Sequence, residues 1–235
     1  MLTYRRTLAA SALAVVALIT SACSPWTGDG AGPPAASGTA LAAVDTLTVK
    51  GRAPKTGYDR DAFGRGWVDV DRNGCGTRED ILKRDLTGVR YADGHCKVAS
   101  GTLADDPYTG TDVPYVRGRS KVDIDHVVAL SDAWQKGAQQ WSAETRRRFA
   151  NDPLNLLAVD AATNRRKSDG DAATWLPPNG AYRCAYVARQ VAVKKKYEVW
   201  ITEGERDAMK RVLRECPQQK LPQEGDPAGG PAGKP

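Results

Sequence analysis

A short alternation of apolar and polar side chains at residues 122–125 predicts a β-strand. Because successive side chains of a strand point to opposite faces, Val122 and Ile124 face one way while Asp123 and Asp125 face the other. The pattern therefore places two carboxylates on one face of this strand. Three other short runs are strand candidates: residues 47–49, 67–70 and 154–159.

Helical spacing of apolar residues is strongest near the end of the chain. It predicts a helix over residues 181–197 and a second helix that starts at the capping box Thr202-Glu203-Gly204-Glu205 and extends to Glu215. We expect these two helices to form a C-terminal hairpin. Strand and helix signals in this arrangement predict an α+β fold. Shorter helices are predicted at residues 78–85 after Thr77, from the N-cap Ser142 to Phe149, and at residues 161–167 after the N-cap Asp160.

The beginning of the chain is typical of an export signal. Arg5 and Arg6 precede an apolar run at residues 8–19, and small residues follow it. The arginine pair leaves both the general secretory and the twin-arginine routes open. Composition then divides the chain into a signal peptide at 1–22, a flexible tether at 23–43, a folded domain at 44–217 and a disordered tail at 218–235.

The end of the signal offers a candidate membrane anchor. Thr20-Ser21-Ala22-Cys23 resembles a bacterial lipobox, in which the cysteine is acylated, so Cys23 is a candidate lipidation site. Plain cleavage with release of the protein is the alternative. We therefore expect a protein that is either secreted or attached to the outer face of the cell membrane.

Removal of the signal leaves four cysteines: Cys75, Cys96, Cys184 and Cys216. Four cysteines in an exported chain predict two disulfides, for which three pairings exist. We favour Cys75–Cys96 with Cys184–Cys216, because cysteines that are neighbours in sequence close the shorter loops. The absence of any C-x-x-C pair argues against a zinc site.

A candidate catalytic centre follows from the residues beside the predicted strand. Hydrolysis of a phosphodiester needs an activated water and a cation that neutralises charge developing on the phosphate. His126 follows Asp125 directly, and imidazole has a pKa suited to a general base near neutrality. Asp125 offers the hard oxygen that Mg²⁺ prefers, and Asn164 offers a neutral one. In an Asp-His pair without further context, the histidine is more often a packed structural residue than a catalytic one. The residues around the pair therefore decide between these two interpretations.

Four segments carry that wider pattern. They are Ile124-Asp125-His126-Val127-Val128-Ala129-Leu130, Asn151-Asp152-Pro153-Leu154-Asn155-Leu156, Asn164-Arg165-Arg166-Lys167 and Trp175-Leu176-Pro177. Together they resemble the HNH (His-Me finger) nuclease branch found in secreted actinobacterial proteins and in the C-terminal domain of modification-dependent restriction enzymes. The resemblance implies a ββα-metal core with surrounding helices.

Carried over to this sequence, the resemblance assigns a role to each polar residue. It makes His126 the general base and Asp125 the first metal ligand. Asn155 becomes the asparagine that orients the histidine loop from the second strand, and Asn164 becomes the last ligand, on the helix. Asparagine at that last position favours Mg²⁺ or Mn²⁺ as the cofactor over softer metals.

The charge of the chain allows a polyanionic partner without requiring one, since the net charge is only +6. Basic residues cluster at 146–148, 165–167 and 194–196. Only the second cluster shares the predicted helix with the ligand, so Lys167 and Arg165 are the predicted phosphate contacts. A solvated helix face is the alternative for each cluster.

A second metal candidate is the segment Asp69-Val70-Asp71-Arg72-Asn73-Gly74 with Thr77 and Asp80, which matches part of a calcium loop. Structural Ca²⁺ would stabilise an exported domain, although glycine, asparagine and aspartate also form ordinary turns. Both interpretations stay open at this point.

The sequence thus predicts an exported, metal-dependent endonuclease that cleaves DNA, with RNA as a second candidate substrate. No row of aromatic residues interleaves with the basic clusters, so little sequence specificity is expected. We expect a monomer and leave an immunity partner open. The alternative is a noncatalytic cell-envelope lipoprotein that uses the same fold as a binding module.

Overall fold

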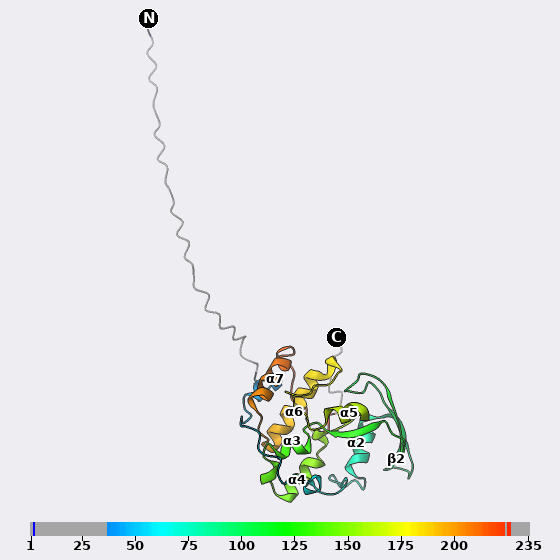
Figure 1. The fold of residues 1–235 in the computed structure, drawn as a ribbon. Coiled ribbons are helices and arrows are strands. Elements are labelled where there is room, and N and C mark those ends of the chain that lie inside the picture. Colours follow the sequence, from blue (N-terminus) through cyan, green and yellow to red (C-terminus); the bar gives the residue numbers. More distant parts are fainter. Residues whose placement is uncertain (1, 3–36, 224, 227–235) are drawn as a thin grey trace. The chain divides into compact units, whose positions relative to one another are not determined.

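A computed structural model describes residue 2, residues 37–223 and residues 225–226 (Figure 1). Apart from residue 2, the predicted signal peptide at residues 1–22 lies outside the described residues, and so does Cys23. In the part of the chain that the structure describes, no helix is long and apolar enough to cross a membrane.

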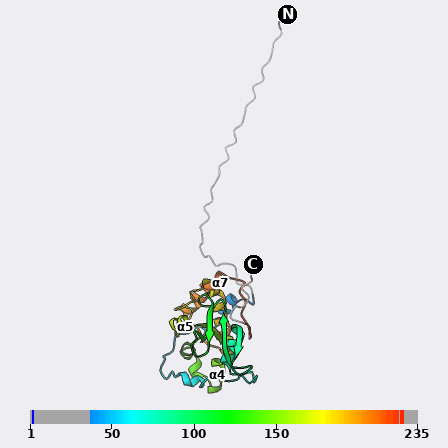
Figure 2. The same ribbon diagram turned by 90° about the vertical axis from the view of Figure 1, so that its right-hand side faces the viewer.

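The strands form two small antiparallel sheets, and the α+β prediction is confirmed. The first sheet has the order β1 (Thr87–Tyr91), β2 (Val98–Leu103) and β3 (Val113–Val116), and the second pairs β4 (Val122–His126) with β5 (Leu156–Asp160). β2 lies at one edge of the body in Figure 1, and Figure 2 faces that side, with strands in front. The helices are α1 (Ala40–Val44), α2 (Thr77–Asp85), α3 (Leu130–Trp134), α4 (Ala143–Ala150), α5 (Ala161–Lys167), α6 (Arg183–Tyr197) and α7 (Glu203–Arg214), with 3₁₀ helices η1 (Arg60–Phe63), η2 (Ala138–Gln140), η3 (Pro153–Asn155) and η4 (Gly180–Tyr182).

β4, β5 and α5 form a strand-strand-helix unit. The two strands pair along their full length, and α5 starts directly after β5. The Asp160 carboxylate caps this helix by accepting a hydrogen bond from the Thr163 backbone N–H at 2.7 Å. α5 packs on both strands, and its last residue, Lys167, reaches back to Asp125 on β4. The unit therefore brings the end of β4 and the side of α5 together.

Three apolar cores support this unit. Residues 186–194 of α6 are all buried. Val187 and Val191 belong to the largest core, Val193 belongs to another, and α1 and α7 pack against the helix. A second core lies between the three-stranded sheet, α2 and the β4–β5 pair. A third surrounds α3, α4 and η1. The strand-strand-helix unit thus contacts cores on more than one side, which fixes the side chains that it presents.

Most predicted elements are present, but two of the predicted strands are wrong. Val49 forms only an isolated bridge with Ile201, and residues 67–70 form no strand. The Val68 N–H donates to the Asn151 side chain at 3.0 Å, and the Val68 carbonyl accepts from Thr77. The Asn151 side chain and the first residue of α2 therefore satisfy the hydrogen-bonding groups of Val68, so this segment needs no strand partner.

The folded body extends beyond the predicted domain of residues 44–217 at both ends. α1 begins at Ala40, within the predicted tether of residues 23–43. The Ala40 N–H donates to the Gln219 carbonyl at 2.7 Å, within the predicted tail. Alanine is typical of linkers, but it also favours a helix, and its small side chain lets this segment pack closely.

Two disulfides join the cysteines in the predicted pairs, Cys75–Cys96 and Cys184–Cys216. The first ties the loop before α2 to the segment before β2. The second joins α6 to the segment after α7, and these helices pack against each other as the predicted hairpin. Both bonds therefore link segments that the cores already bring together.

Removing the second disulfide should destabilise the fold measurably. We expect the double substitution Cys184→Ala/Cys216→Ala to lower the free energy of unfolding by about 2–4 kcal/mol, because the bond restricts the unfolded chain. Urea unfolding of both proteins measures the difference. Peptide mapping without reduction should recover both pairs, whereas a peptide joining Cys75 to Cys184 would contradict them.

Candidate active site

His126 ends β4 and is held from two sides. Its Nε2 lies 2.8 Å from the carbonyl oxygen of Ala150, and the Trp67 ring stacks on it with centroids 5.8 Å apart and an interplanar angle of 11°. Because a carbonyl only accepts, Nε2 carries the hydrogen, and Nδ1 keeps a lone pair. The ring therefore has one fixed nitrogen and one that could accept a proton.

Burial lowers the pKa of His126 to about 3, and the positive charges of Arg60 and Lys167 act in the same direction. The imidazole is therefore neutral at neutral pH, as a proton acceptor must be. An anionic phosphate beside the ring would favour the protonated form and raise this pKa towards the range in which a base works best.

The lowered pKa of His126 predicts acid sensitivity. The unfolded chain binds a proton at this residue near pH 6.5, whereas the folded chain does so only near pH 3. Since the unfolded state binds more protons between these values, stability should fall as the pH drops from about 6.5 towards 3. Urea midpoints across this range should decline more steeply for the wild type than for His126→Gln. Parallel curves would contradict the shift.

Asp125 is buried beside His126, with both carboxylate oxygens engaged. Oδ1 lies 3.0 Å from the Lys167 ammonium, and Oδ2 accepts a hydrogen bond from the Tyr108 hydroxyl. Burial raises the pKa of Asp125, while Lys167 and Tyr108 oppose that rise. A cation already neutralises this carboxylate, which shows that its position suits positive charge.

Asn155 is fully buried and fixes the chain that follows His126. Its side-chain oxygen accepts from the Val128 N–H at 2.8 Å, and its side-chain nitrogen donates to the Val128 carbonyl at 3.3 Å. The Asn155 carbonyl also accepts from the Val127 N–H at 2.8 Å. This residue therefore lies where the sequence predicted an asparagine that orients the histidine loop.

Asn164, on α5, faces the same hollow as Asp125 and His126. All three line a cavity of about 220 Å³. The strand-strand-helix unit thus gathers the predicted base and both predicted metal ligands at one place. The remaining residues of this lining are Arg60, Ile124, Ala129, Leu130 and Ser168.

Arg60 is a residue that the sequence analysis missed. It is an exposed cation on η1, and it lines both the cavity of Asn164 and a neighbouring hollow of about 170 Å³ formed with Trp67. Its charge is suited to a phosphate next to His126. No spacing in the sequence connects it to the motif, because the chain from residue 60 to residue 126 passes through α2 and a whole sheet.

Lys167 occupies a different place from the one expected of a phosphate contact. Its side chain is buried, and its ammonium donates to Asp125 and, at 2.9 Å, to the backbone carbonyl of His126. It points into the unit instead of towards solvent. Arg165 is exposed on the same helix, so of the two predicted phosphate contacts only Arg165 has a side chain open to a ligand.

In each of the other two basic clusters one residue is part of the fold, whereas the other two are exposed. Lys194 is fully buried and pairs with Asp132 at 3.0 Å and Glu205 at 2.7 Å. The Arg146 guanidinium donates to the backbone carbonyls of Ala62 and Trp141. Each of these two clusters therefore supplies fewer basic side chains to the surface than the sequence indicates.

The predicted calcium loop is closed by its own hydrogen bonds. Asp69 accepts from the backbone N–H groups of Asn73 at 3.1 Å and Gly74 at 2.9 Å. The Asn73 side-chain nitrogen donates to Asp71 and Asp80, each at 2.9 Å. These contacts satisfy a turn by themselves, and Ca²⁺ at this loop stays a prediction.

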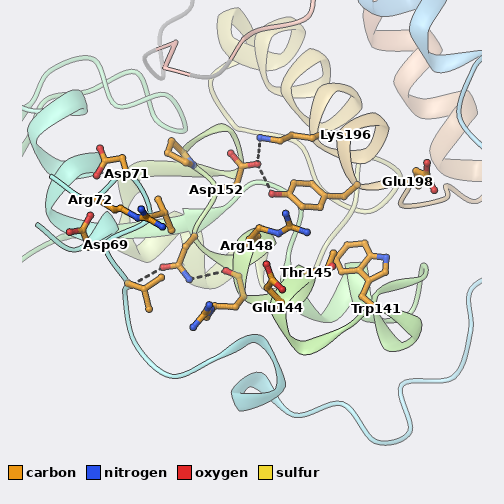
Figure 3. A pocket seen from close by; sticks show the side chains of 16 residues that line it. Asp69, Asp71, Arg72, Trp141, Glu144, Thr145, Arg148, Asp152, Lys196 and Glu198 are labelled. Atoms are coloured by element: carbon orange, nitrogen blue, oxygen red, sulfur yellow. Dashed lines mark hydrogen bonds and ion pairs between the residues drawn. The ribbon is translucent and has the colours of Figure 1, made fainter. Parts of the chain in front are cut away.

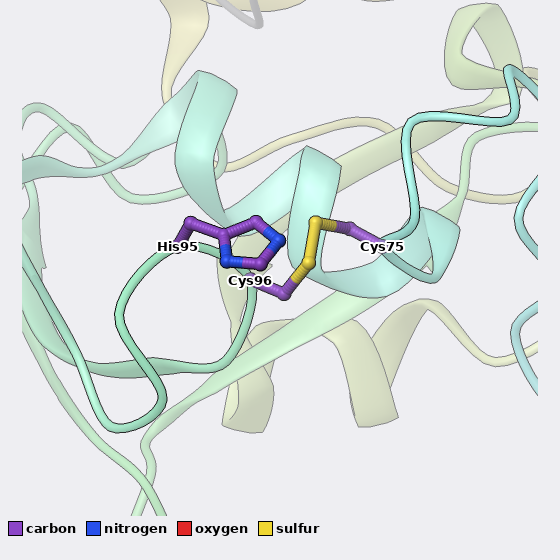
Figure 4. Close-up of side chains that lie close together, drawn as sticks. All are labelled: Cys75, His95 and Cys96. Carbon is purple, nitrogen blue, oxygen red and sulfur yellow. A yellow bond between two sulfur atoms is a disulfide. The ribbon is translucent and has the colours of Figure 1, made fainter.

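His95 lies beside the first disulfide, as Figure 4 shows. Its ring and the sulfur atoms of Cys75 and Cys96 approach within the spacing of metal ligands. The sulfurs are bonded to each other, so neither is a thiolate that could bind a metal while the disulfide is intact.

Comparison with known proteins identifies the family of this chain. Residues 76–212, more than half of the chain, match the family described as GmrSD restriction endonucleases, C-terminal domain. The match spans Asp125, His126, Asn155 and Asn164. A protein of Arthroderma benhamiae named "Uncharacterized secreted protein" is 40% identical over 185 residues, which cover 78% of this chain and 87% of that protein. The resemblance predicted from the sequence is confirmed: the chain belongs to the family of GmrSD restriction endonuclease C-terminal domains.

Proposed function

We propose that this protein is an exported, metal-dependent endonuclease that hydrolyses phosphodiester bonds in DNA, with RNA as a second candidate substrate. The observation that carries the proposal is the convergence of Asp125, His126 and Asn164 on one cavity of the strand-strand-helix unit. The family supports a nuclease, since its description names restriction endonucleases. We further propose that β4, β5 and α5 form a ββα-metal core.

Asp125 and Asn164 are the residues that would hold the metal. Both offer hard oxygen ligands, as Mg²⁺ and Mn²⁺ prefer. The Lys167 ammonium lies 3.0 Å from Oδ1 of Asp125, so a metal would share this carboxylate with the ammonium or displace it. When bound, the metal would supply a positive charge that stabilises the phosphate as it is cleaved.

The remaining steps belong to side chains of this chain. His126 accepts a proton from the attacking water at Nδ1, because Nε2 is fixed by Ala150. Asn155 holds the loop that carries the ring. Arg60 and Arg165 are exposed and hold the phosphate backbone through charge, without reading bases. Lys167 keeps Asp125 ionised and oriented until the metal binds.

The location of the protein outside the cytoplasm is part of the same proposal. Two disulfides suit an oxidising environment, and the relative from Arthroderma benhamiae is named as secreted. Attachment through a lipid on Cys23 is proposed from the sequence alone.

Substitutions of the two proposed ligands test their assignment. We expect Asp125→Asn and Asn164→Ala to lose DNA cleavage together with Mn²⁺ affinity measured by calorimetry. Asp123→Asn is the matched control, because Asp123 lies on the same strand, outside the lining of the cavity. Unchanged Mn²⁺ binding in both ligand variants would refute the assignment of Asp125 and Asn164 as ligands. Equal losses of cleavage and Mn²⁺ affinity in Asp123→Asn would show that the effect is not specific to these two residues.

A further inference from the structure

A large hollow lies beside the candidate active site and contains none of the residues assigned to catalysis or metal binding. This hollow, called here the flank cavity, has a volume of about 930 Å³. It lies between residues 68–72, helix α4 and the C-terminal end of α6 (Figure 3). Its lining includes Arg72, Arg147, Arg148 and Trp141.

The flank cavity shares a wall with the His126 site. Val68 and Asn151 line the flank cavity, and their chain neighbours Trp67 and Ala150 line the hollow next to His126. The Val68 N–H donates to the Asn151 side chain at 3.0 Å, which joins the two segments. The two hollows are therefore adjacent, with the joined segments 67–68 and 150–151 between them.

Arg147 connects the two hollows physically. A Cβ placed on Gly64, which lines the hollow beside His126, would lie 3.3 Å from the Cγ atom of Arg147. The stem of Arg147 thus rests against that glycine, and Arg147 also lines the flank cavity. Arg148 follows it on α4, and both side chains are exposed.

The lining of the flank cavity holds five acidic residues and four basic ones, so its capacity to bind an anion depends on which cations lie outside ion pairs. Within the described ranges, no ion pair involves Arg72, Arg147 or Arg148. Asp152, in contrast, pairs with Lys196 at 2.7 Å and accepts from the Tyr197 hydroxyl.

Two further acidic groups are engaged within their own loop. Asp69 accepts two backbone N–H bonds, and Asp71 accepts from Asn73. Glu144 and Glu198 are the other acidic residues of this lining. The hydrogen bonds of Asp69 and Asp71 leave both charges in place beside Arg72. The anion-binding part of the flank cavity is therefore confined to Arg147 and Arg148 on α4, which are exposed and outside ion pairs in the described part of the chain.

Trp141 gives the flank cavity an aromatic surface. Its ring packs against Phe149 and Tyr197, with centroids 5.3 and 5.8 Å away, yet it remains partly exposed. A ring supported from behind and open in front is suited to stack an unpaired base. Guanidinium groups beside such a ring are the usual partners of the phosphates that follow the base.

We propose that the flank cavity binds the strand of nucleic acid that continues beyond the cleaved phosphodiester, with Arg147 and Arg148 on its phosphates and Trp141 against one unpaired base. This inference rests on the proposed function. It makes the substrate a strand that is unpaired on one side of the cleaved bond, at least while it is bound.

The test compares two double variants of the full chain without metal. Binding is measured for single-stranded oligonucleotides of about 4 and about 16 nucleotides across a series of salt concentrations. We expect Arg147→Ala/Arg148→Ala to weaken binding of the long oligonucleotide about tenfold and to lower its salt slope by about one to two units. Arg211→Ala/Arg214→Ala is the control, because it removes two exposed charges from α7, away from the flank cavity.

Each outcome decides the proposal. Loss of affinity for the long oligonucleotide in Arg147→Ala/Arg148→Ala alone, with an unchanged thermal midpoint of unfolding, supports the proposal. Partial retention of this affinity in Trp141→Phe but not in Trp141→Ala supports the stacking role of Trp141. Equal losses in both double variants, or no loss, overturn the proposal. Binding of mononucleotides alone would make the cavity a small-ligand site and overturn it too. Failure of the wild type to cleave DNA would refute the proposed function whatever the binding results.

Discussion

Replacing His126 with alanine should lower the rate of DNA cleavage by about 100- to 10,000-fold, the usual contribution of a general base. The variant loses the only neutral imidazole at the cavity of Asp125 and Asn164. The variant should still fold, with some loss of stability, because the side chain is buried against Trp67 but takes no part in the three apolar cores. Initial rates at saturating Mg²⁺ measure the effect, and circular dichroism checks the fold.

His95→Ala is the matched control for this substitution. The chain has two histidines, and His95 is exposed beside the first disulfide, away from the lining of the cavity. We expect wild-type rates for the control. Wild-type rates in His126→Ala as well would remove the base from the mechanism.

Replacing Lys167 with methionine should have the largest effect on stability. Removal of the ammonium leaves the buried Asp125 carboxylate without its cation, and breaking a buried pair from one side costs about 3–5 kcal/mol. Mg²⁺ or Mn²⁺ should then stabilise the variant more than the wild type, because the metal replaces the missing charge. Urea unfolding with and without metal measures both differences.

Arg165→Met serves as the control on the same helix. Arg165 is exposed, and surface substitutions usually change stability by less than about 0.5 kcal/mol. If Lys167→Met were as stable as this control in metal-free buffer, the buried pair would not hold Asp125 as described. If metal stabilised Lys167→Met no more than the wild type, Asp125 would not be a ligand.

Local signals explain why the central unit could be predicted. The alternation at residues 122–125 is the strand β4, and the carboxylate of Asp160 starts α5 as its N-cap. Ser142 and Thr202 likewise cap α4 and α7 through hydrogen bonds to Thr145 and Glu205. Each of these signals acts over three or four residues, so the sequence contains it in full.

Elements that depend on distant residues could not be predicted in the same way. β1 is largely exposed and pairs with an irregular register, so it leaves no alternation to detect. The inward position of Lys167 depends on Asp125, 42 residues earlier in the chain. Spacing on one helix face could place Lys167 near Asn164, but it could not show which way a buried lysine points.

The residues of the candidate site also fall into those that the sequence predicted and those that it did not. The motif contained Asp125, His126, Asn155 and Asn164, and the fold brings them to one place. Arg60 and Trp67 come from a loop that reaches His126 only through tertiary packing. The motif residues could therefore be found from the sequence, whereas the residues that pack beside them could be found only from the structure.

The most direct test of the account is the conversion of supercoiled plasmid DNA by the purified protein in EDTA, in Mg²⁺ and in Mn²⁺. We predict intact plasmid in EDTA, nicked or linear plasmid with either metal, and recovery of cleavage when metal is added back after chelation. Intact plasmid under every metal condition, or cleavage that persists in EDTA, would contradict a metal-dependent nuclease built on Asp125, His126 and Asn164.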